Sequence, residues 1–172
     1  FSELRNWKQC PFYHKLTYID KIDGFVGNEF TAFGRAIHDS CEKLILEGDD
    51  GKMYNFFINK FEKEIEDLLL KEVELKQDLV DQMVTQGENI LPSILPGIKE
   101  YFEDFEVVST EEQLMVSMEE FEGYKFKGFI DLVIKTPDDK YHIIDWKTCG
   151  WGWDSRKRSD PMVTYQLTLY KH

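Results

Sequence analysis

Residues 125–147, KFKGFIDLVIKTPDDKYHIIDWK, decide the fold of this 172-residue chain. Two apolar runs flank a central TPDDK segment, in which the proline and the paired aspartates are typical of a turn. We therefore expect two antiparallel strands, residues 125–135 and 141–147, joined by a turn at residues 136–140. Residues 112–118 predict a further strand before them, so three strands follow one another in the second half of the chain.

Two carboxylates occupy matching positions in this hairpin. If the turn is centred on Asp138, then Lys135 pairs with Tyr141. The same register places Asp131 directly opposite Asp145, with Cβ atoms about 4.5–5.5 Å apart. Two carboxylates so close in an apolar hairpin repel each other, and a divalent cation is the simplest compensation for their charge. Because the ligands are oxygens, the expected ion is Mg²⁺ or Mn²⁺.

A lysine follows on the same face of the last strand. Side chains alternate along a strand, so Asp145 and Lys147 share one face while Trp146 points to the other. A metal ion at the two carboxylates would polarise a phosphoryl oxygen and activate a bound water. Lys147 would offset the charge that builds up on the phosphate. These residues together predict hydrolysis of a phosphodiester.

A structural role for the same residues is the alternative. One aspartate would then be paired with Lys147 or Lys127, and the other would be solvated at a sheet edge. A shift of one residue in the register would also separate Asp131 from Asp145. The prediction of a metal site therefore depends on the position of the turn.

Helices are expected in the first half of the chain. Residues 31–47 carry an apolar stripe at helical spacing, and the GDDG segment at residues 48–51 ends this helix. His38 lies beside the stripe, where a histidine is more often a core residue than a ligand. Residues 52–104 are nearly all helical in pattern, with Pro92 and Pro96 marking a kink or a break. A short helix is expected at residues 161–172, giving an α/β layered fold.

Composition limits the functions that are possible. The net charge of −12 is unusual for a nucleic-acid-binding protein, so any such binding must be local to a groove. The three cysteines form no CxxC pair, which argues against a disulfide framework or a structural zinc site and favours a reducing, cytoplasmic location. No stretch approaches the roughly 18 consecutive apolar residues of a membrane span. We expect one domain over residues 1–172, and Phe1 in place of an initial Met suggests a fragment.

Four motifs match a known family in its order along the chain. They are GRAIH at residues 34–38, GFID at 128–131, DWKT at 145–148 and QLTLY at 166–170, preceded by an arm ending in CPFY at residues 10–13. With these motifs the chain resembles the PD-(D/E)XK nuclease superfamily, and within it the RecB-like exonuclease branch. The resemblance implies a restriction-endonuclease-like core, with a mixed central β-sheet flanked by helices and an all-helical insertion at about residues 51–105.

The resemblance also implies roles for individual residues. Asp131 and Asp145 would bind metal, with His38 as a further ligand, and Lys147 would be the catalytic lysine. Two residues of the last helix would position the nucleic acid or the lysine; these are Gln166 and Tyr170. Glu112, at the head of the first strand, is a weaker candidate for an outer metal ligand, and its alternative is an ordinary exposed acid.

A basic cluster with interleaved tryptophans precedes the last helix. Cations that neutralise phosphates beside rings that stack on bases are typical of proteins that grip single-stranded ends. A solvated loop with its tryptophans packed on the core is the alternative. The candidates for nucleic-acid binding are Trp151, Trp153, Arg156, Lys157 and Arg158, with Arg35 and Lys8 adding to the same groove.

The chain departs from the family in two respects. Some members hold an iron–sulfur cluster through one early and three later cysteines; Cys10 stands at the early position, but the later ones are absent, so a cluster is not expected. Members also continue from the last helix into another strand, so we expect truncation, or a further domain or partner, after His172.

We expect a metal-dependent DNA nuclease, most simply an exonuclease acting on DNA ends through a metal-activated water. An endonuclease and a catalytically silent module that binds DNA ends are the alternatives of the same fold. A helical interaction protein that uses its acidic middle is a third alternative.

Overall fold

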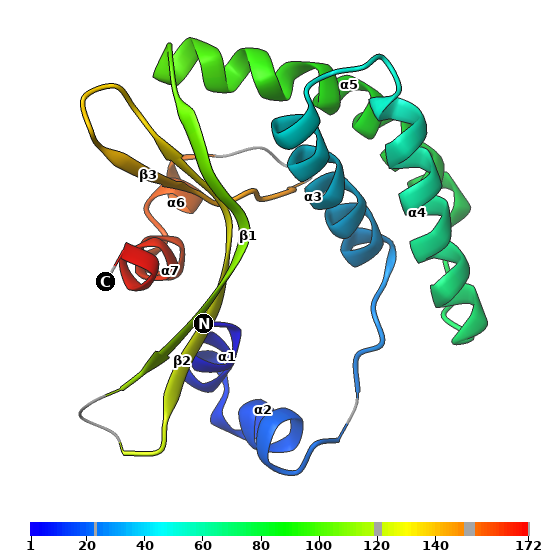
Figure 1. Ribbon diagram of the computed structural model, residues 1–172. Coiled ribbons are helices and arrows are strands. Elements are labelled where there is room, and N and C mark those ends of the chain that lie inside the picture. The colour runs from blue at the N-terminus through cyan, green and yellow to red at the C-terminus, as the bar shows by residue number, and fades with distance from the viewer. Residues whose placement is uncertain (23, 119–121, 150–153, 172) are drawn as a thin grey trace. The chain divides into compact units, whose positions relative to one another are not determined.

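The structure is a computed structural model that describes residues 1–22, 24–118, 122–149 and 154–171 (Figure 1). The chain divides into two compact units. Unit 1 comprises Phe1–Phe25, Glu111–Ile130 and Cys149–His172, and unit 2 comprises Val26–Thr110 and Asp131–Thr148. Within the described ranges, no helix is both long and apolar enough to cross a membrane.

Helix α3, Glu29–Glu47, is the central helix of unit 2 and agrees with the helix predicted at residues 31–47. A reciprocal capping box between Asn28 and Thr31 starts it, and Gly48, with a φ of 76°, ends it. The predicted stripe is buried at Phe33, Ile37, Cys41 and Leu44, while Ile45 is half-buried. The stripe packs against α4, which runs beside α3 in Figure 1.

Helices α4, Met53–Leu70, and α5, Gln77–Phe102, fill the region predicted to be helical. The break between them falls at residues 71–76, and α5 contains both Pro92 and Pro96. Helix α4 contributes Phe57 and Phe61 to the core around α3. A Cβ added at Gly87 of α5 would lie 2.2 Å from Cε1 of Phe57, so only glycine lets α5 pack this closely on α4.

Three strands form a sheet in the order β1-β2-β3. They are β1, Glu106–Ser117, β2, Lys125–Lys135, and β3, Tyr141–Ile144. Strand β2 has the predicted bounds, whereas β1 starts at Glu106 rather than Glu112 and β3 stops three residues before Lys147. The family resemblance implied a mixed sheet, but over the described residues the sheet is antiparallel, as the hairpin prediction required. Leu132 and Ile134 of β2 are fully buried and pack with Ile98 of α5.

Unit 1 holds the two ends of the sequence. Helix α1, Ser2–Gln9, ends before Cys10, and α2, Pro11–His14, continues into a π-helical turn at Lys15–Ile19. Near the other end lie a short helix, α6, Ser155–Arg158, and α7, Pro161–Lys171. The predicted terminal helix therefore forms over its described residues.

Candidate active site

The hairpin has the register expected from its sequence. Lys135 pairs with Tyr141, and the ladder continues to Leu132 opposite Ile144. The next positions along this register are Asp131 and Asp145, one step beyond the last pair. Asp131 is still within β2, whereas Asp145 follows the end of β3. The two carboxylates thus stand at the open end of the ladder.

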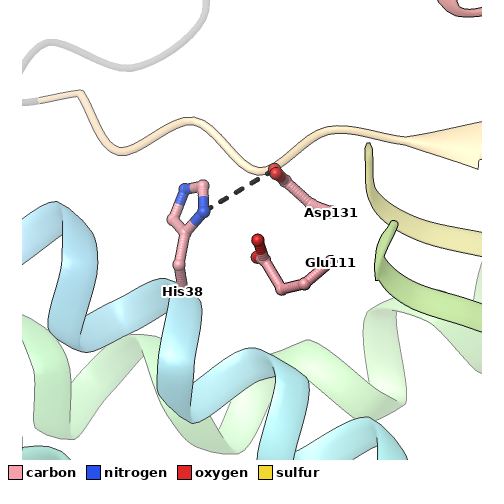
Figure 2. A group of neighbouring side chains, drawn as sticks. All are labelled: His38, Glu111 and Asp131. Atoms are coloured by element: carbon pink, nitrogen blue, oxygen red, sulfur yellow. Dashed lines mark ion pairs between the residues drawn. The ribbon is translucent and has the colours of Figure 1, made fainter. Parts of the chain in front are cut away.

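Asp131 is the buried carboxylate of this group, with 8% of its surface exposed. Its Oδ2 accepts a hydrogen bond of 2.6 Å from the Trp146 backbone N–H. The same oxygen lies 3.7 Å from Nδ1 of His38, which projects from α3 (Figure 2). Burial raises the pKa of the Asp131 carboxyl above its usual range, and His38 and the Trp146 N–H oppose that rise. The ionised carboxylate is therefore costly here without positive charge beside it.

Asp145 and Lys147 form an ion pair on the chain segment after β3. Both charges influence Asp131, since Asp145 raises the pKa of its carboxyl and Lys147 lowers it, each less strongly than burial does. The structural alternative expected one aspartate to pair with Lys147, and Asp145 does so. It also required the second aspartate to be solvated at a sheet edge, and Asp131 is buried.

Trp146 fixes the segment that carries Asp145 and Lys147. Its half-buried side chain packs against both hydrophobic clusters of unit 2, the one around α3 and the one around Leu132 and Ile134. The strand has already ended at Ile144, so the ladder alone does not hold these residues in place. Two contacts of Trp146 therefore hold this segment in place of strand pairing. Its indole packs in the core, and its backbone N–H donates a hydrogen bond to Asp131.

A third acidic side chain lies near His38 and Asp131. His38, Glu111 and Asp131 each offer one ligand atom, and these atoms all lie within 4.8 Å of one another (Figure 2). Glu111 is the first residue of the second segment of unit 1, and in β1 it directly follows Thr110 of unit 2. Sequence reasoning named its neighbour Glu112 instead, which is not part of this group.

The donor set fits a divalent cation. It combines an imidazole nitrogen with carboxylate oxygens, which are ligands that divalent metal ions accept. A cation there would also offset the cost of the buried Asp131 charge, the same cost that raises the pKa of its carboxyl. Within unit 2, the residues that would hold it are His38 and Asp131, with Asp145 beside them.

The predicted nucleic-acid-binding residues are distributed over both units. In unit 2, Arg35 is exposed and forms an ion pair with Glu64 at 3.0 Å. In unit 1, Nε2 of Gln166 donates to Oη of Tyr170 at 3.1 Å, so these two residues do lie together.

The basic cluster is described only in part. Arg156, Lys157 and Arg158 form most of α6, whose first turn is capped by Asp154. Arg156 also pairs with Asp154 at 3.1 Å. Trp151 and Trp153 lie outside the described residues.

Sequence reasoning missed two supports of the site. The Trp146 N–H is a main-chain group, so no residue type could have indicated it. Thr148 lies close to Gly34 of α3, where an added Cβ would be 3.5 Å from Oγ1 of the threonine. Gly34 belongs to the GRAIH motif and Thr148 to the DWKT motif, so the sequence contains both residues. Only the fold shows that they lie close together.

A hairpin that presents acidic residues and a lysine beside a histidine is consistent with the site of a metal-dependent phosphodiester hydrolase. The sequence model of the PD-(D/E)XK nuclease superfamily matches residues 1–172, and the chain belongs to this superfamily. Membership implies metal-dependent nuclease activity on a nucleic acid. No curated protein and no solved structure matched the chain.

Proposed function

We propose that this protein is a DNA exonuclease of the RecB-like branch that depends on Mg²⁺ or Mn²⁺, with α4 and α5 as a helical insertion in the nuclease core. The observation that carries this proposal is the buried carboxylate of Asp131, 3.7 Å from His38 and influenced by both Asp145 and Lys147. A buried structural aspartate needs a positive partner, but it does not need a second carboxylate such as Asp145 beside it, and a bound cation would compensate both.

In this proposal each residue has a distinct role. His38, Asp131 and Asp145 hold the metal ion, with Glu111 or Glu112 as an outer ligand. A divalent ion at these ligands supplies Lewis-acid polarisation of the phosphate and lowers the pKa of a bound water. Lys147, which is paired with Asp145, places an ammonium group where negative charge develops on the phosphate.

This proposal also assigns nucleic-acid contacts to residues within each unit. Gln166 and Tyr170 orient the substrate, and their mutual hydrogen bond supports a shared role. The exposed guanidinium of Arg156 and its neighbours in α6 are suited to phosphate contacts. The remaining candidates are Arg35, Lys157, Arg158, Trp151 and Trp153.

The test is digestion of DNA with Mn²⁺ or Mg²⁺ by wild-type protein and by two variants, Asp145→Ala and Lys147→Ala. Both variants should lose activity, because each removes half of the ion pair at the proposed centre. Lys140→Ala is the matched control, since Lys140 is an exposed residue of the same hairpin. Full activity in both Asp145→Ala and Lys147→Ala would contradict the proposal.

Linear and covalently closed circular DNA compared in the same assay separate the two modes of cleavage. An exonuclease degrades only the linear form. Cleavage of the circular DNA would identify the protein as an endonuclease, and the proposal of the metal site would still stand.

A further inference from the structure

Unit 1 contains a groove between α1 and α7 that the proposed centre does not use. Its volume is about 320 Å³. Leu4 and Trp7 of α1 face Tyr165 and Leu169 of α7 across it, and its walls are apolar. Trp7 leaves 54% of its surface exposed and Tyr165 leaves 47%, although aromatic rings of this size are usually much more buried. Exposed rings that line one groove indicate a binding surface.

The charges at this groove are positive. Arg5 and Lys8 belong to its lining, and among the described lining residues there is no carboxylate. Nζ of Lys8 lies 5.1 Å from the centroid of the Tyr165 ring. The nearest acid along α1, Glu3, is paired with His14 at 3.0 Å. In a chain with a net charge of −12, a groove whose described lining includes two cations and no carboxylate favours an anionic, aromatic ligand.

The size of the groove narrows the choice of ligand. Pockets of roughly 300–1,000 Å³ are typical for one small ligand. The volume here is therefore large enough for a ligand of nucleotide size.

We infer that this groove binds single-stranded nucleic acid, with bases stacking on Trp7 and Tyr165 and with phosphates at Arg5 and Lys8. Stacking on aromatic rings beside cations binds any sequence, because every base has a flat aromatic face. That the bound strand is the nuclease's own substrate rests on the proposed function, whereas the binding itself does not.

The experiment measures fluorescence anisotropy of a labelled single-stranded oligonucleotide, in EDTA so that no cleavage occurs. Trp7→Ala and Tyr165→Ala should each weaken binding by roughly 5- to 100-fold, the loss expected for one stacked base. Arg5→Glu and Lys8→Glu should weaken binding and make it less dependent on salt. Tyr101→Ala is the matched control, because Tyr101 is an 81% exposed aromatic residue of α5 in unit 2.

A second measurement uses the unaltered protein and so does not depend on the folding of a variant. A bromouracil-substituted oligonucleotide is cross-linked by ultraviolet light, and the modified peptides are identified by mass spectrometry. Cross-links at Trp7 or Tyr165 are the expected result. Cross-links only at other peptides, or affinity unchanged in all four variants, would overturn the inference.

Two further outcomes distinguish this inference from the proposed function. If the protein cuts no DNA with any metal but binds the oligonucleotide through Trp7 and Tyr165, the groove inference stands alone. If Trp7→Ala abolishes self-association and leaves oligonucleotide binding unchanged, the groove is a protein-docking surface and the inference is wrong.

Discussion

Tyr170 packs directly against the backbone of Gly128. A Cβ added at Gly128 would lie 2.5 Å from Cε1 of the tyrosine ring, too close for any real contact. The same ring is hydrogen-bonded through its hydroxyl to Gln166. Gly128 thus fixes how closely α7 approaches β2 within unit 1.

Replacing Gly128 with alanine should therefore displace Tyr170. We expect Gly128→Ala to destabilise the fold by about 1–3 kcal/mol, the usual cost of overpacking. Denaturant unfolding of the wild type and the variant measures this change in the free energy of unfolding. In a Tyr170→Ala background the same substitution should cost much less, and equal costs in both backgrounds would contradict the contact.

Helix α5 offers a matched pair of glycines. Gly87→Ala should destabilise unit 2 by about 1–3 kcal/mol, because the new Cβ would meet Phe57 at 2.2 Å. A Cβ added at Gly97 would meet nothing within 4 Å. Because alanine has the higher helix propensity, Gly97→Ala should stabilise unit 2 by up to about 1 kcal/mol. Thermal unfolding of both variants is the measurement, and shifts of the same sign would contradict the packing of α4 on α5.

Metal binding should depend on Asp131. Mn²⁺ should raise the unfolding temperature of the wild-type protein, by an effect equivalent to roughly 3 kcal/mol when the free ion exceeds its Kd about a hundredfold. EDTA should reverse the shift. Asp131→Asn keeps an oxygen that can accept from the Trp146 N–H but removes the charge, so it should fold and lose the response.

The control for this prediction is Asp139→Asn, in the exposed turn of the same hairpin. It should respond to Mn²⁺ as the wild type does. Loss of the response in Asp139→Asn, or its retention in Asp131→Asn, would place the metal elsewhere.

Trp146→Ala should damage both the fold and the centre. Removing an indole that packs on two clusters should cost about 2–4 kcal/mol, somewhat below the value for a fully buried tryptophan. Trp146→Phe should cost less and retain more nuclease activity. Denaturant unfolding and activity of the two variants check this, and a stable but inactive Trp146→Phe would show that the indole itself acts in the reaction.

Cysteine reactivity tests the burial of α3. Burial, with a smaller effect of Asp131, raises the pKa of the Cys41 thiol to about 12. The folded protein therefore keeps Cys41 as an unreactive thiol from neutral pH up to strongly alkaline pH. Iodoacetamide at mildly alkaline pH should label the exposed Cys10 and spare Cys41, and denaturant should make both reactive. Peptide mass spectrometry reports each site, and rapid labelling of native Cys41 would contradict the packing.

The hairpin was predictable because two local signals agreed. The TPDDK turn placed Lys135 opposite Tyr141, and this register then determined each later pair as far as Leu132 opposite Ile144. The end of β3 was not predictable, since Asp145, Trp146 and Lys147 continue the alternating pattern of the strand. A tertiary contact, the Trp146 N–H on Asp131, ends the regular ladder instead.

The sequence pattern could not distinguish Glu111 from Glu112 as the acidic residue near the metal-binding group. Glu111 has a φ of 46°, which interrupts the extended backbone of β1. Strand alternation cannot be carried across such a residue, so the sequence could not tell which glutamate lies near His38. In α3, by contrast, the helical spacing was regular, and the predicted stripe is the buried one.

The support that Asp131 receives from residue 146 has a consequence for how this position can vary. The donor is the main-chain N–H, which every residue except proline possesses. The carboxylate therefore places no demand on the chemical nature of the side chain between Asp145 and Lys147. In this chain the side chain at that position contributes its volume to the core instead, where Trp146 packs against both hydrophobic clusters of unit 2.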